Sequence, residues 1–258
     1  MLGKLLKHEW KATARRYGLF YLILAAVTLF TAAIHAIPAD NVFFSMGEIS
    51  LIIVYVISLF GIVFCSTGMA VVRFYKNMVS DEGYLTFTLP AKVEQLVFAK
   101  FLVAVVWQLI TVVLCMVSLY CVFVVGHVKP DVFFEGLASV VKEFDGLLPL
   151  FVVVMIVGIM YQILIYYLSI AIGQLFGNYK ILASVLAYCI LGFVLELIIG
   201  FAMLGVFGLT GMLQMGDTLA VSEGMTGLYL ITTGISVIIS AVSYFVTCYL
   251  LKKKLNLV

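Results

Sequence analysis

Six long apolar runs constrain this chain more than any other feature of its sequence. A helix needs about 20 residues to cross the roughly 30 Å hydrocarbon core of a bilayer, and each run is long enough to do so. The six predicted spans are residues 17–37, 49–72, 101–125, 149–175, 180–201 and 226–251. The sequence therefore predicts an all-α polytopic membrane protein in which residues 1–258 form a single transmembrane domain.

Composition and motifs exclude most other protein classes. Residues are 65% hydrophobic and only 11% charged, whereas a soluble domain is about half apolar and a quarter charged. The sequence has no phosphate-cradling G-x-x-x-x-G-K-[ST], no H-E-x-x-H and no G-x-S-x-G, and its 5 cysteines lie in apolar runs without a C-x-x-C. We therefore predict a protein that is not an enzyme, with no catalytic, metal-binding or cofactor-binding residues and no nucleic-acid partner.

The distribution of basic residues predicts the orientation. If the N-terminus lies inside, Lys129 and Lys142 are the only two of the 15 Lys and Arg residues that fall in outer segments. Cytoplasmic segments carry the excess of Lys and Arg in membrane proteins. The sequence thus predicts a multi-pass protein of the cell (plasma) membrane with cytoplasmic N- and C-termini.

Residues 1–16 have the periodicity of an amphipathic helix. At about 100° per residue, Trp10 lies on an apolar face with three leucines, and Arg15 lies on a basic face. This pattern predicts an interfacial helix on anionic lipid. Glu9 falls within the apolar arc, where it either pairs with Arg16 or meets a basic partner from another segment.

Three further segments interrupt the apolar runs. Residues 73–100 form the long polar stretch of the first half, and we interpret them as a cytoplasmic contact surface. Residues 126–148 have helical apolar spacing, which predicts an amphipathic helix on the outer interface. Residues 201–225 are rich in glycine yet apolar, which favours a re-entrant segment over a plain extension of the fifth span.

Apart from Lys180 at the inner end of the fifth span, Glu196 is the one acidic or basic side chain within the predicted spans. A charge at the bilayer centre costs about 2.5 to 3.5 kcal/mol on insertion scales, so such a residue is a functional candidate. Gly192 and Gly200 lie one turn away on either side and allow another helix to approach closely. We predict that Glu196 faces a wet cavity or a second copy of the chain. The alternative is a carboxyl near the outer interface, protonated or bonded to the backbone.

Several motifs together resemble a known family. They are Asp81-Glu82-Gly83-Tyr84, then Phe87-Thr88-Leu89-Pro90, then Lys100 at the start of the third span. This order resembles the loop between helices two and three in type-2 permeases of ATP-binding-cassette (ABC) exporters. The start KLLKHEWKATARRYG and the stretch YLSIAIGQLFGNYKILAS are similar to bacterial members, especially Gram-positive ones. Phe98-Ala99 departs from the small-Gly pair that is frequent before the lysine.

The resemblance implies a six-helix permease half with residues 1–16 as a connecting helix. The segment 73–100 would carry a coupling helix seated on a soluble ABC ATPase subunit, which binds the ATP and magnesium, and a second permease, identical or different, would complete the export path. The residues that the resemblance assigns to the ATPase contact are Asp81, Glu82, Gly83, Tyr84 and Phe87. Those of the connecting helix are Glu9, Trp10, Arg15 and Arg16, and those of the path or dimer interface are Glu196, Gly192 and Gly200.

A coupling segment also needs aromatic anchors, and the sequence offers Phe74, Tyr75, Tyr84 and Phe87 for this purpose. The leading hypothesis is therefore a permease subunit that exports a peptide, drug or lipid with energy from a separate ATPase. One alternative is a gradient-driven secondary carrier with Glu196 as its proton site, although no internal repeat is evident. Another is a non-transporting membrane anchor for a partner protein.

Overall fold

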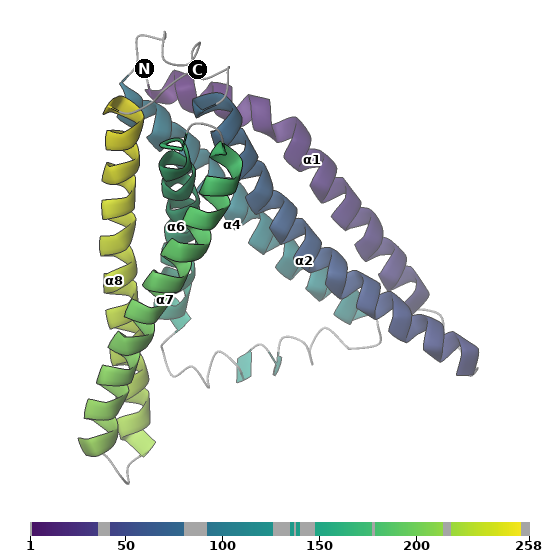
Figure 1. Ribbon diagram of the computed structural model, residues 1–258. Coiled ribbons are helices and arrows are strands. Elements are labelled where there is room, and N and C mark those ends of the chain that lie inside the picture. Colours follow the sequence, from purple (N-terminus) through teal and green to yellow (C-terminus); the bar gives the residue numbers. More distant parts are fainter. Residues whose placement is uncertain are drawn as a thin grey trace. The chain divides into compact units, whose positions relative to one another are not determined.

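The computed structural model describes residues 2–35, 42–79, 92–125, 135–136, 138–139, 148–176, 179–213 and 218–253. Six long helices account for nearly all of these residues (Figure 1). They are α1 (Leu2–His35), α2 (Val42–Met78), α4 (Val93–Val125), α6 (Leu148–Gly173), α7 (Lys180–Leu213) and α8 (Thr218–Lys253). Each contains a stretch long and apolar enough to cross a membrane, and the described residues contain no strand. The prediction of six spans is confirmed.

Proline positions agree with these helix boundaries. Of the 4 prolines, Pro149 occupies the first turn of α6, where its missing N–H leaves no hydrogen bond unmade. The other three, Pro38, Pro90 and Pro130, fall between the helices. Without proline in their interiors, the helices satisfy every backbone group locally, as a hydrocarbon environment demands.

The chain forms two compact units. The first comprises Met1–Ala70 and Leu102–Gly146, and the second comprises Val71–Phe101 and Leu147–Val258. Helices α2 and α4 contribute to both units, since the boundary crosses each of them near the end that flanks residues 79–92.

In the first unit, α1, α2 and α4 pack along one another (Figure 1). Its core centres on Tyr17, Val103 and Trp107, which are each at most 7% exposed. Six partly buried side chains pack against this centre: Leu6, Ala14, Phe20, Tyr21, Met69 and Ile110.

In the second unit, α6 lies between α7 and α8 and contacts both. The half of α6 nearest its C-terminus is the most buried, with Ile163, Tyr167 and Ala171 all at most 3% exposed. The last turns of α2 and the first turns of α4 belong to this unit, and Met78 and Val97 there are fully buried.

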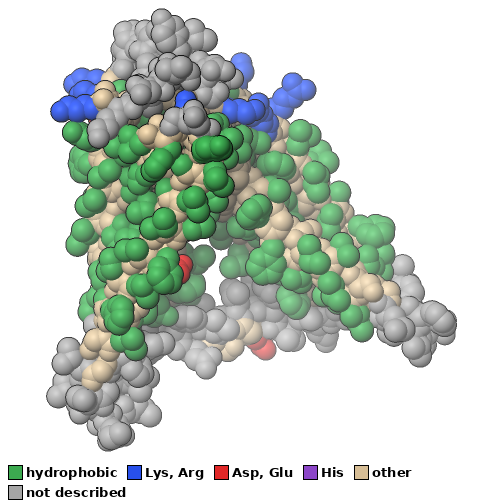
Figure 2. Space-filling model, viewed as in Figure 1, with side chains coloured by type: hydrophobic (Ala, Val, Ile, Leu, Met, Phe, Trp, Pro, Cys, Tyr) green, Lys and Arg blue, Asp and Glu red, His purple; other side chains and the backbone are tan. Residues whose placement is uncertain are grey.

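Large apolar side chains cover the sides of the helices, and few Lys or Arg side chains interrupt the apolar surface in this view (Figure 2). Leu29, Phe64, Phe201 and Phe245 are each at least 69% exposed. The apolar stretch of α7 is the least covered of the six, at 6% buried. Such a surface is stable against lipid and unstable against water, which agrees with a multi-pass membrane protein.

The predicted boundary between residues 16 and 17 is absent from the structure. The expected interfacial helix 1–16 and the first span form one unbroken helix, α1. Between them only Gly18 disfavours helix, and a single glycine costs just about 1 kcal/mol. At 1.5 Å per residue, the 34 residues of α1 extend about 51 Å, so its basic first turns reach well beyond a 30 Å core.

The three segments that were predicted to interrupt the spans are residues 73–100, 126–148 and 201–225. Helix extends into each of them, and part of each lies outside the described residues. Helix α2 runs to Met78 and α4 starts at Val93, so helix covers both ends of segment 73–100. Within 126–148, only 135–136, 138–139 and the start of α6 are described, and all are helical. In the glycine-rich segment, α7 continues to Leu213 and α8 starts at Thr218, which is the extension that we weighed against a re-entrant segment.

Candidate functional site

The residues assigned to the ATPase contact lie outside the described part of the chain. They are Asp81, Glu82, Gly83, Tyr84 and Phe87, and Pro90 is also outside. The structure does describe the two helix ends that flank them. We call the intervening residues loop 80–91, after the family loop that their sequence resembles, and describe its two flanks.

Phe74 anchors the flank before loop 80–91. Its ring stacks on Tyr167 of α6 with centroids 3.8 Å apart and an interplanar angle of 10°, and Phe74 is 1% exposed. The prediction that Phe74 is an anchor for a partner protein is therefore wrong. A buried ring cannot enter another protein's groove, and it instead ties the end of α2 to α6. Tyr75, at the next position, is partly exposed.

Glu94 and Tyr244 anchor the flank after loop 80–91. The Tyr244 hydroxyl of α8 donates a hydrogen bond to the Glu94 carbonyl oxygen of α4 at 2.9 Å. Lys252 Nζ lies 3.7 Å from Glu94 Oε1, although this ion pair is exposed and contributes little. Phe98 meets the Tyr244 ring edge to face, with centroids 6.3 Å apart. Lys100, two residues further, is 6% exposed, so its side chain is covered by the protein.

The connecting-helix residues take different positions on α1. Trp10 is 39% exposed, and its ring stacks on that of Trp107 in α4 with centroids 4.4 Å apart and an interplanar angle of 14°. Arg15 and Arg16 are exposed, and Arg16 Nη1 lies 3.9 Å from Met69 Sδ of α2. Glu9 is half-buried, and its carbonyl oxygen accepts a hydrogen bond from Thr13 at 2.8 Å.

Trp107 is the centre of an aromatic stack that sequence reasoning missed. Its indole lies between Trp10 and Tyr17, and the Tyr17 ring is 4.6 Å away at an interplanar angle of 4°. The indole N–H donates to Thr13 Oγ1 at 2.9 Å. Trp10, Thr13 and Tyr17 share one face of α1 at i, i+3 and i+7 spacing, so this face fits a single indole from α4. The stack fixes α4 against α1.

A cluster of polar side chains joins α1, α2 and α4 in the first unit. The Tyr21 hydroxyl donates to the Trp107 carbonyl oxygen at 3.2 Å and lies 3.0 Å from Thr111 Oγ1. Ser66 Oγ lies 3.0 Å from Thr111 Oγ1 and donates to Gln108 Oε1 at 2.9 Å. The predictive signal was present in the sequence, because hydroxyl and amide side chains in hydrocarbon need partners.

Glu196 lies in the second unit on an exposed face of α7. A Cβ atom added at Gly192 or Gly200 would meet nothing within 4 Å. The predicted close helix contact at these glycines is therefore not made within the described part of this chain. The three residues form an open stripe on the span that the protein covers least.

Polar side chains of α6 contact α7 at Tyr188, one turn before this stripe. Gln162 Nε2 donates to the Tyr188 hydroxyl at 2.8 Å, and the Tyr188 hydroxyl lies 3.4 Å from that of Tyr166. The rings of Tyr166 and Tyr188 stack with centroids 4.7 Å apart. Tyr188 precedes Glu196 by eight residues, so at about 100° per residue the two side chains point about 80° apart around α7.

Gly173 serves a purpose that the sequence did not identify. An added Cβ would collide with Ser184 Oγ and would lie 2.7 Å from the Ser184 backbone nitrogen and 2.8 Å from the Lys180 carbonyl oxygen. The Gly173-x-x-x-Gly177 pattern resembles a helix-dimer motif, yet Gly173 instead admits the first turns of α7 of the same chain. It closes the α6–α7 hairpin.

The second unit also contains an apolar cavity of about 310 Å³ between α4, α6 and α8. Aromatic rings of Phe98, Phe101, Tyr244 and Phe245 contribute to its wall. Ser240 lines it as well, is 8% exposed and makes no hydrogen bond through its hydroxyl. The described residues contain no group of three or more His, Cys, Asp or Glu side chains that could hold a metal ion.

The chain was also compared with known proteins. No family model, no curated protein and no solved structure matches it. A functional assignment therefore depends on the sequence motifs and on the geometry above.

Proposed function

We propose that this chain is the membrane-spanning permease subunit of an ATP-driven exporter, with its ATPase on a separate soluble subunit. The six membrane-spanning helices and the motifs of loop 80–91 support this proposal. In it, the protein lies in the plasma membrane with both termini in the cytoplasm, as the basic residues indicate.

One observation carries the proposal: both flanks of loop 80–91 belong to the same compact unit. Phe74 ties the flank before the loop to α6, and Tyr244 ties the flank after it to α8. A coupling segment must transmit a rigid-body movement of its partner to the membrane helices. A loop with both ends fixed to one body can do this, whereas a loose connector would absorb the movement.

Glu196 has a defined place in this proposal. If α7 enters the membrane near Lys180, a rise of 1.5 Å per residue puts Glu196 about 24 Å into the bilayer, beyond the midplane. An uncompensated carboxylate facing lipid would be unfavourable. The open stripe of Gly192, Glu196 and Gly200 therefore faces the export path or a second permease.

The proposal is tested with the purified complex in vesicles. ATP with magnesium should drive export after the proton gradient has been collapsed by an ionophore. Replacement of Glu82 by Lys, or of Tyr84 by Ala, should leave the protein inserted but weaken ATPase binding. Loss of one hot-spot contact costs about 2 kcal/mol, roughly thirtyfold in affinity. Lys92→Ala, beside the loop but outside its motif, is the matched control. Export and ATPase binding that are unchanged in both loop variants would contradict the proposal.

The position of Glu196 within a candidate membrane span favours a second candidate function, a proton-driven carrier. Carboxyl side chains within the membrane are common members of proton relays in transporters. Transport that stops when the gradient is collapsed, and continues without ATP, would identify this function. The same vesicles thus distinguish the two candidates.

A further inference from the structure

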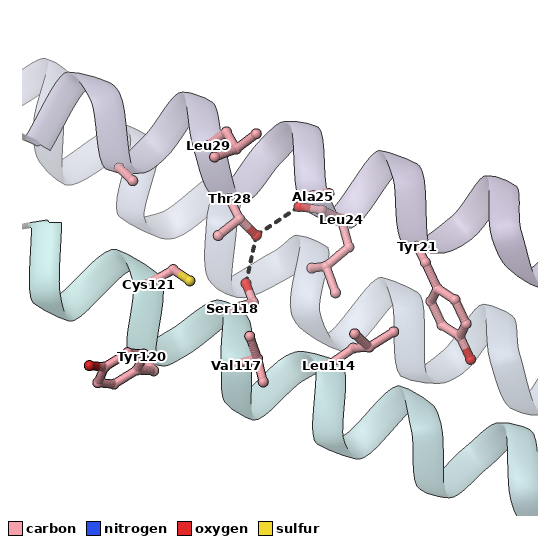
Figure 3. A pocket seen from close by; sticks show the side chains of 11 residues that line it. Tyr21, Leu24, Ala25, Thr28, Leu29, Leu114, Val117, Ser118, Tyr120 and Cys121 are labelled. Atoms are coloured by element: carbon pink, nitrogen blue, oxygen red, sulfur yellow. Dashed lines mark hydrogen bonds between the residues drawn. The ribbon is translucent and has the colours of Figure 1, made fainter. Parts of the chain in front are cut away.

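The first unit has a groove between α1 and α4 with a volume of about 440 Å³ (Figure 3). Its floor is buried, since Leu24, Thr28, Ala32 and Ser118 are each at most 5% exposed. Its rim is exposed, with Leu29 at 70% and Val117 at 51%. The groove is therefore open along its side.

The polar atoms of the floor are already paired with one another. Thr28 and Ser118 point toward each other from α1 and α4 (Figure 3), with their hydroxyl oxygens 2.6 Å apart. Thr28 Oγ1 donates its hydrogen to the Leu24 carbonyl oxygen at 2.7 Å. The hydrogen bond between Thr28 and Ser118 is therefore donated by the Ser118 hydroxyl. The Tyr55 hydroxyl of α2, 2.7 Å from Ser118 Oγ, then donates to Ser118.

The hydroxyl hydrogens of Thr28, Ser118 and Tyr55 are therefore all bonded within the protein. At the other end of the groove, the Tyr21 hydroxyl is bonded to the Trp107 carbonyl oxygen and lies beside Thr111 Oγ1. A hydrogen-bond acceptor in the groove would therefore find no free hydroxyl hydrogen on Thr28, Ser118 or Tyr21. Water needs two to four polar partners to occupy a cavity stably, so water is disfavoured as well.

The size and shape of the groove restrict further which molecules can occupy it. From Tyr21 to Ala32, the groove follows α1 for 11 residues, or about 16 Å. Its volume is about three times that of the 150 Å³ apolar cavity that holds one benzene molecule. A helix, with a diameter of about 10 Å or more, is too wide for it. An extended hydrocarbon chain fits its length and its lining.

We propose that this groove holds one acyl chain of a bilayer phospholipid as a resident ligand. The lateral opening gives the chain direct access from the bilayer, whose acyl chains are present at very high concentration. Close packing against Leu24, Ala25 and Val117 distinguishes this chain from the freely exchanging lipid around the other helix faces. The proposal is independent of the proposed export function.

A photoreactive lipid tests the proposal directly. The full-length protein is reconstituted in phosphatidylethanolamine and phosphatidylglycerol vesicles that contain phosphatidylglycerol with a diazirine on its acyl chain. After illumination, the labelled residues are mapped by peptide mass spectrometry. Labelling should concentrate at the groove-lining positions of α1 and α4 and exceed that at Ile23 and Phe30, which are exposed but do not line the groove.

Adjacent alanines provide a matched pair of variants. Ala25 lines the groove and Ala26 does not, although both are exposed on α1. Ala25→Phe should lower labelling of the groove about tenfold, because the ring takes the volume of the chain. Ala26→Phe should leave it unchanged. Both side chains lie at the surface, so both variants should fold, which gel filtration in detergent checks.

Three results would overturn the proposal. The first is labelling that follows exposure alone, with equal density at Ile23 and in the groove. The second is groove labelling that Ala25→Phe leaves unchanged. The third is efficient cross-linking between two copies through Cys121, which lines the groove, because a second copy rather than a lipid would then cover it.

Discussion

Replacing Thr13 by Val should destabilise the contact between α1 and α4. Thr13 Oγ1 accepts the hydrogen bond of the Trp107 indole at 2.9 Å, and valine has nearly the same shape without the oxygen. Interhelical hydrogen bonds in membrane proteins contribute about 0.6 kcal/mol on average and up to about 1.7. Trp107 is 7% exposed, so its N–H would stay buried without a partner, which places the cost near the upper limit. We expect a loss of about 1.5 kcal/mol, or roughly tenfold in the unfolding equilibrium.

Intrinsic fluorescence reports on this contact with unusual selectivity. The sequence contains 2 tryptophans, and both lie in the stack of Trp10 on Trp107. Unfolding in mixed micelles of a mild detergent and dodecyl sulfate can therefore be followed by tryptophan emission. Circular dichroism of the two stacked indoles should show an exciton couplet that disappears in Trp10→Phe.

Thr233→Val in α8 is the matched control. Among the described residues, the Thr233 hydroxyl bonds the Tyr229 carbonyl oxygen of its own helix and no residue of another helix, so its loss removes no interhelical hydrogen bond there. A double-mutant cycle with Trp107→Phe should show that Thr13→Val adds little once the indole N–H is gone. If Thr13→Val and Thr233→Val unfold within about 0.5 kcal/mol of each other, the hydrogen bond carries no stability and the reasoning is refuted.

Three further predictions concern orientation, the α7 stripe and the α6–α7 hairpin. In a cysteine-free background, a cysteine at Asp40 should react with an impermeant maleimide from outside and one at Ser80 should not; labelling of Ser80 in intact cells would reverse the orientation. Glu196→Gln should keep assembly and lower transport of a cationic or polar substrate, and full export by Glu196→Leu would show that the carboxyl has no role in the path. Gly192→Leu should disturb association of two permeases but not folding, since a Cβ added at Gly192 meets no described atom within 4 Å. Gly173→Ala should cost about 1–3 kcal/mol, because the added Cβ meets backbone atoms of α7, and unchanged thermal stability would contradict this close approach.

The six spans could be predicted because length and hydropathy suffice to identify a membrane helix. Which face of each helix contacts protein could not, since lipid and protein interiors are equally apolar and the runs have little periodicity. The stack of Trp10 on Trp107 joins residues far apart in the sequence, and no local pattern specifies such a pair. The small hydroxyl residues were the usable signal, because Ser66, Thr111 and Ser118 all bond across helices.

The site was predicted less completely than the fold. Phe74 was interpreted as a contact for a partner because it begins the polar segment, yet the helix continues past it and the ring packs on Tyr167. Glu196 was identified from its charge alone, whereas the bonds of Tyr188 to Gln162 and Tyr166 depend on the packing of α6 against α7 and could not be predicted. The hydrogen bond between Tyr244 and Glu94 joins residues 150 positions apart in the sequence, and no local sequence pattern predicted it.

The most direct test of the proposed function is affinity purification of the tagged chain from its native membrane in mild detergent. Our account predicts that a soluble ATPase subunit copurifies in stoichiometric amount and hydrolyses ATP with magnesium. It also predicts that Glu82→Lys and Tyr84→Ala release this subunit while the membrane protein remains intact. A stable, transport-active chain that purifies without any ATPase, and works equally well in both variants, would contradict the account.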